Sequence, residues 1–101
     1  MRTSYGVVWR VGESPLARGK LELLPRVVRL DGVTGEERVA FEIPYEELEC
    51  VHVGRTPAER LNGHQTLVIE QRGREPVVVS AVAQAGVLAE ITERVAKLTL
   101  S

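Results

Sequence analysis

The chain has 101 residues, a formal net charge of -1 and 44% hydrophobic residues, the composition of one ordinary globular domain. This balance excludes intrinsic disorder and a second core, and it provides no global field to attract nucleic acid or an anionic membrane. The single cysteine, Cys50, excludes an internal disulfide. Eleven arginines against two lysines hint at a GC-rich genome or a warm habitat.

The N-terminal residues give an expectation about location. Residues 1–6 run directly into a strand-like segment and lack the apolar stretch of a signal peptide. No apolar run in the chain approaches the ~20 residues of a membrane span. We therefore expect a cytoplasmic protein without a transmembrane segment.

Seven strands are predicted before residue 81, because apolar residues alternate with polar ones in short runs separated by turn residues. The turn residues Asp31-Gly32 are expected to end the third strand, and Pro44-Tyr45 forms a corner after the fourth. The predicted strands are 5–11, 16–24, 26–30, 37–43, 48–53, 65–71 and 75–80.

After Ser80 the apolar period changes to that of a helix. The apolar stripe consists of Leu88, Ile91, Val95 and Leu98, with Val87 beside it. Acid-first pairs, Glu90–Arg94 and Glu93–Lys97, occupy the opposite face at the favourable i, i+4 spacing. The pattern predicts an amphipathic helix over 82–98 with Ser80 as its N-cap. The expected fold is mainly β with one C-terminal helix, an antiparallel, partly open barrel that the helix caps.

This order of elements resembles the pleckstrin-homology-like (PH-like) superfamily, in particular its small bacterial members and the related GRAM domains. Three stretches carry the likeness: Gly19 to Leu30, Phe41 to Val51 with its Ile43-Pro44 and acidic pair, and the last hairpin with the closing helix. The resemblance covers about residues 5–98. It implies a seven-stranded PH-like barrel that binds phosphoinositides, peptides or other domains, or assembles with itself, without chemistry of its own.

Two groups of basic residues are candidate contacts for an anion or a nucleic acid. Phosphoinositide-binding relatives use Lys and Arg around the first loop, but here residues 12–15 carry a carboxylate and no base. Only the last hairpin offers a basic pair, Arg72 and Arg74, which we keep as candidate contacts for an anionic lipid or small ligand. We expect no specific phosphoinositide binding.

A second basic group lies on the early strands and comprises Arg18, Lys20, Arg26 and Arg29. Single-stranded nucleic-acid binders interleave such charge with aromatic platforms, whereas aromatic residues are only 4% of this chain. We expect a solvated outer face paired with carboxylates and no nucleic-acid partner. The Arg26 and Arg29 spacing is also one residue short of the Arg-x-x-x-Arg motif of cyclic-dinucleotide-binding PilZ domains.

Cys50 and His52 alternate on one strand and could supply two zinc ligands, with His64 not far along the chain. A structural zinc site needs four ligands, and the sequence shows no second close pair. We therefore interpret Cys50 as a small, half-buried residue and His52 as ordinary, and we expect no metal and no cofactor. No catalytic residues are identified, because Cys50 and His52 are parallel neighbours on an extended strand and no Gly-rich phosphate loop is present.

The sequence favours a non-enzymatic binding or assembly module that acts by protein–protein association, with an unidentified protein partner or with itself. Segment 48–53 has one charged residue, so as an edge strand it would offer its backbone to a second copy. The candidate contact residues are Val51 and Val53, or Cys50, together with Tyr45 at the corner. We expect a homo-oligomer. The alternative is a module that binds an anionic lipid or small ligand through the last hairpin.

Overall fold

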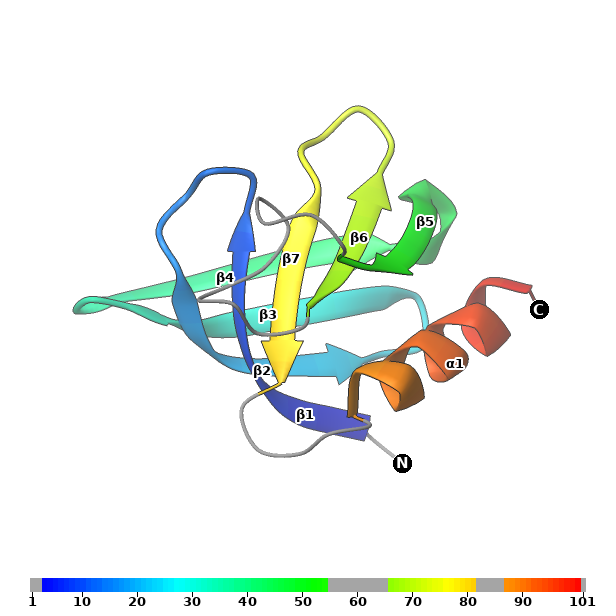
Figure 1. Cartoon of the computed structure of the whole chain (residues 1–101), viewed down its shortest axis with the longest axis horizontal. Helices are drawn as coiled ribbons and strands as arrows, with labels where there is room; N and C mark the ends of the chain where they lie inside the picture. Colours follow the sequence, from blue (N-terminus) through cyan, green and yellow to red (C-terminus); the bar gives the residue numbers. More distant parts are fainter. Residues whose placement is uncertain (1–2, 55–65, 82–86, 101) are drawn as a thin grey trace.

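The computed structural model describes residues 3–54, 66–81 and 87–100. Seven antiparallel strands form one curled, half-barrel sheet in the order β4-β3-β2-β1-β7-β6-β5, followed by one C-terminal helix (Figure 1). The strands are β1 Thr3–Val11, β2 Ala17–Leu23, β3 Val27–Thr34, β4 Glu37–Pro44, β5 Leu48–Val53, β6 Leu67–Gln71 and β7 Val77–Ala81; η1 is a 3-10 turn at Tyr45–Glu47, and α1 is Val87–Leu100. The mainly β prediction with a C-terminal helix is confirmed.

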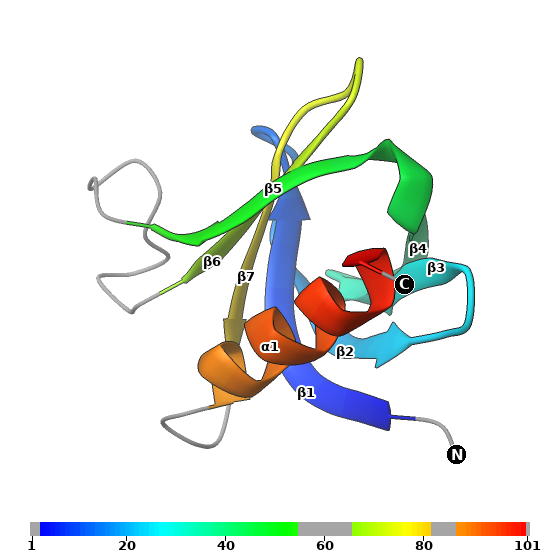
Figure 2. The ribbon, with the colours of Figure 1, turned by 90° about the vertical axis from the view of Figure 1, so that its right-hand side faces the viewer.

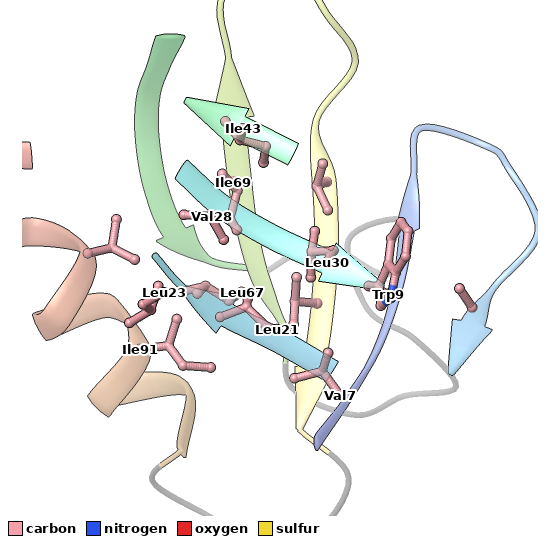
Figure 3. Close-up of a cluster of buried hydrophobic side chains, with 14 residues drawn as sticks. Val7, Trp9, Leu21, Leu23, Val28, Leu30, Ile43, Leu67, Ile69 and Ile91 are labelled. Carbon is pink, nitrogen blue, oxygen red and sulfur yellow. The ribbon is translucent and has the colours of Figure 1, made fainter. Parts of the chain in front are cut away.

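The sheet forms two crossing halves around one core. β2, β3 and β4 run across the direction of β6 and β7, and β1 pairs with both β2 and β7 (Figure 1). Apolar side chains from both halves and from α1 converge between them (Figure 3). The buried cluster comprises Val7, Trp9, Ala17, Leu21, Leu23, Val28, Leu30, Ile43, Leu67, Ile69, Val77, Val79, Ile91 and Val95. The inward faces predicted for β1, β2, β4 and β6 are confirmed by this cluster and its half-buried neighbours, because alternate residues of a strand face opposite sides.

The predicted turn at Asp31-Gly32 is wrong, because both residues lie inside β3, which continues to Thr34. Gly32 is the register partner of Gly19 on β2. A Cβ at Gly19 would collide with the backbone of Asp31 and Gly32, so the two strands can approach this closely only with glycines. The Asp31 carbonyl also accepts a hydrogen bond from the Trp9 indole Nε1 at 3.2 Å. The glycine is therefore used for close packing, and the chain turns instead at Gly35, which has a φ of 61°.

Gly19→Ala should destabilise the domain by about 2 kcal/mol, because the added methyl meets backbone that cannot move aside cheaply. Gly6→Ala is the matched control on the neighbouring strand, since a Cβ there would meet nothing within 4 Å. The control should melt within about 0.5 kcal/mol of the parent or be slightly more stable. Urea denaturation measures both; equal midpoints for the two variants would refute the close-packing role.

α1 lies across the open end of the half-barrel, where it contacts β7 and η1 (Figure 2). Two residues of the predicted stripe, Ile91 and Val95, are buried in the core. The side chains of Val87, Leu88 and Leu98 lie outside the described part of the chain, as do residues 82–86 of the predicted helix. The N-cap prediction is wrong: Ser80 belongs to β7 and pairs with Val8 of β1.

Ile91→Asp should destabilise the domain by about 4 kcal/mol or more, because it replaces a fully buried side chain with an unpaired charge. Glu93→Ala is the control on the exposed face of the same helix. It removes only the Glu93–Lys97 ion pair of 3.6 Å and should cost about 0.5 kcal/mol or less. Thermal melts compare the two; an Ile91→Asp protein that melts like the parent would show that α1 does not close the core.

Candidate functional site

β5 is a terminal strand of the sheet, as the self-association hypothesis required. It pairs with β6 on one side, and no described strand pairs with its other side. The Gly54 N–H donates to the Thr66 carbonyl at 2.9 Å, which marks that rung as hydrogen-bonded. Because hydrogen-bonded and non-hydrogen-bonded rungs alternate in an antiparallel ladder, the backbone groups of Val51 and Val53 point to the open side. Within the described ranges, these backbone groups have no partner strand, and the Val53 carbonyl faces His52 Nδ1 at 3.4 Å.

The two ends of the sheet differ in their protection. Natural edge strands are guarded by charged side chains, proline or bulges, which discourage pairing with another chain. β4, at one end, carries Glu37, Arg38 and Glu42 and finishes at Pro44. β5 carries a formal charge only at Glu49, and its Val53 side chain is 38% exposed. β5 is thus the less charged edge, and its one irregularity in register lies before Val51 and Val53.

A bulge near the start of β5 sets which side chains face inward. The register shifts between Leu48, which pairs with Gln71, and Cys50, which pairs with Glu70. Glu49 is the extra residue, and it reverses the alternation of the residues that follow. Val51 consequently packs against the core. Val51 can contribute its backbone to an interface, whereas its side chain belongs to the fold.

The same reversal brings Cys50 and His52 to the outer face, next to Glu70 of β6. One ligand-type atom from each of the three side chains lies within 4.8 Å of the other two. His52 Nε2 is 3.4 Å from Glu70 Oε2, and His52 Nδ1 is 3.4 Å from the Val53 carbonyl oxygen. Cys50 is exposed, so the expectation of a half-buried cysteine is wrong. His64 lies outside the described residues.

The hairpin residue Arg74 makes internal contacts. Its guanidinium lies over the Phe41 ring of β4, 4.3 Å from the centroid, and its Nη1 is 3.9 Å from Glu47 Oε2. The Arg72 backbone N–H donates to the Glu47 carbonyl at 2.8 Å, while the Arg72 side chain is exposed. The β6–β7 turn is thereby fastened to η1 and β4.

The hollow beside Arg74 has an acidic lining. It is a hollow of about 520 Å³ that is open to solvent, and its charged residues are Glu49, Glu70 and Glu75 against Arg74 alone. Several converging cations are needed to hold a phosphate, because each exposed contact is weak. The surroundings of the Arg72 and Arg74 pair therefore disfavour an anionic ligand.

Tyr45 and the early basic group have structural contacts as well. The Tyr45 hydroxyl donates to the Leu24 carbonyl at 2.7 Å, and burial raises the pKa of this half-buried phenol. On the outer face of the early strands, Arg29 contacts Asp31 at 3.5 Å and Glu42 at 3.2 Å. Lys20 contacts Glu22 at 3.4 Å, so the expected pairing of this face with carboxylates is confirmed for these residues.

Arg74→Ala should cost about 1 kcal/mol of stability, the usual value of a partly exposed cation–π contact, because it unfastens the β6–β7 turn from β4. Arg72→Ala removes the same charge from the same turn without a ring contact and should change stability by about 0.5 kcal/mol or less. Chemical denaturation distinguishes them. Equal effects of the two variants would contradict the fastening role of Arg74.

Comparison with known proteins identifies a similar fold and no activity. No family model matches the chain, and no curated protein matches it. Among solved structures, the chain is similar to the crystal structure of the C-terminal domain of an unknown protein from Leishmania infantum, with a TM-score of 0.71 and 13% sequence identity. The alignment covers 98% of this chain and 83% of that one. No described helix combines the length and apolar character needed to cross a bilayer.

Proposed function

We propose that the chain is a PH-like, non-enzymatic assembly module that associates with a second copy of itself through the exposed edge of β5. The order of seven antiparallel strands and a closing helix supports the PH-like assignment. The observation that carries the proposed association is the pair of outward-facing backbone segments at Val51 and Val53 on an edge with one formal charge. Edge pairing supplies main-chain hydrogen bonds without requiring a preformed pocket.

The alternation of the ladder restricts how two copies can pair. In an antiparallel pairing of two β5 strands, the outward backbone N–H and C=O groups of the two copies meet when Val51 or Val53 of one copy lies opposite Val51 or Val53 of the other. Such pairings are self-complementary, so they suit a two-fold symmetric dimer, which is the commonest closed assembly. The exposed Val53 side chain would lose contact with water in the same step.

Two observations bear on the other functions considered. Arg74 is engaged with Phe41 and Glu47 beside an acidic hollow, which disfavours an anionic lipid or small anionic ligand. Both ring nitrogens of His52 face oxygen atoms, Nε2 toward Glu70 and Nδ1 toward Val53, which disfavours His52 as the base for a Cys50 nucleophile. A salt-dependent vesicle sedimentation assay separates lipid binding from self-association, because charge-driven binding weakens as salt rises.

The parent should show a mass above 11.1 kDa in multi-angle light scattering at high micromolar concentration. Val53→Lys should shift it to the monomer, since a lysine on the edge strand opposes pairing. Val33→Lys is the matched control: Val33 is 43% exposed, but its strand β3 is paired on both sides. The control should keep the parent's mass.

Thermal melts of both variants establish that a change in mass does not reflect unfolding. A parent that remains at the monomer mass throughout the concentration range would refute self-association. An equal shift by Val53→Lys and Val33→Lys would place the contact surface away from the β5 edge.

A further inference from the structure

We propose that Cys50, His52 and Glu70 form a binding site for a divalent zinc ion on the outer face of β5 and β6. The three side chains belong to one copy of the chain, so the site does not depend on the proposed self-association. Their ligand-type atoms lie within 4.8 Å of one another. In a tetrahedral zinc site, bond lengths of about 2.0–2.3 Å place ligand atoms about 3.5 Å apart. The ligand atoms would therefore move closer together when a zinc ion binds.

The backbone fixes the positions from which these ligands project. Cys50 and Glu70 are direct register partners, and His52 follows Cys50 on the same face of β5. The bulge at Glu49 produces this arrangement, because without it Cys50 would take the opposite face. Three ligands on two adjacent, hydrogen-bonded strands need little backbone ordering when a metal binds.

The contacts of His52 suit a metal ligand. Nδ1 lies 3.4 Å from the Val53 carbonyl oxygen, and it donates to that oxygen in the tautomer that carries the ring proton on Nδ1. In that tautomer the lone pair of Nε2, which lies 3.4 Å from Glu70 Oε2, can bind a metal ion. A metal ion bound to Nε2 and to a Glu70 oxygen would take the place of this contact. Metal-bound histidines commonly donate their other ring N–H to a backbone carbonyl in this way.

The chemistry of the donors selects the metal. A thiolate, an imidazole and a carboxylate are all ligands that zinc accepts, whereas magnesium and calcium prefer oxygen alone. Three protein ligands leave one position of a tetrahedral ion for water. Because Cys50 and Glu70 are exposed, a metal ion can reach the site from solvent.

Cobalt(II) titration of the reduced, metal-free protein tests the site, because a cysteine thiolate bound to cobalt gives a charge-transfer band in the near ultraviolet. The parent should develop this band at one cobalt per chain, and zinc should displace the cobalt. Cys50→Ser should abolish the band. His52→Gln and Glu70→Gln should each weaken metal binding by roughly tenfold or more. The loss of an outer-shell partner already lowers metal affinity by at least that factor, and the loss of a direct ligand should lower it further.

Glu49→Gln is the matched control, because Glu49 is an exposed carboxylate next to Cys50 that is not part of the cluster. It should bind cobalt and zinc like the parent. The absence of a thiolate band in the parent would overturn the proposal, and so would a Glu70→Gln protein with the parent's affinity. Light scattering of the same metal-free samples reports self-association separately, so failure of the zinc site and failure of the assembly are distinguishable.

Discussion

The phase of β5 relative to β6 is the constraint on which the candidate sites depend. One extra residue, Glu49, decides that Val51 packs inward while Cys50 and His52 face outward beside Glu70. With the opposite phase, Val51 would lie in solvent and the thiol would enter the core. The bulge thus places an apolar side chain in the core and polar side chains together on the other face. Bulges commonly change the direction of side chains in this way.

The sheet does not close on itself, since its terminal strands β4 and β5 do not pair, and other contacts hold its two halves together. α1 lies across the open end (Figure 2), and its Ile91 and Val95 side chains are buried. Arg74 joins the β6–β7 turn to Phe41 of β4 and to Glu47 of η1. Tyr45 adds a hydrogen bond from η1 to Leu24. From the sequence, Arg74 and Tyr45 are candidate surface contacts, because basic and aromatic side chains are common in binding sites. In the structure, the aromatic and basic side chains of Tyr45 and Arg74 hold parts of the sheet together, a role that requires no ligand.

Local patterns predicted the strands and the inward faces well, because burial on one side of a sheet imposes a period of two. These patterns gave wrong predictions where the role of a residue depends on a partner that is far away in the sequence. Gly32 was interpreted as a turn residue, since nothing nearby in sequence reveals that Gly19 lies against it. Glu70 was missed for the same reason: it meets Cys50 and His52 only through the register of β5 and β6, and the bulge makes that register unpredictable from alternation alone.

The edge and the outer-face cluster occupy one short strand without competing for the same groups. Pairing at the edge uses backbone groups of Val51 and Val53 that lie in the plane of the sheet. Metal binding uses the side chains of Cys50 and His52, which stand perpendicular to that plane. The Val53 carbonyl belongs to both, because it points to the open edge and lies 3.4 Å from His52 Nδ1. A carbonyl has two lone pairs, so it can accept from His52 and from a paired strand together. Orientation of the His52 ring and formation of an edge ladder would then support one another through this single oxygen.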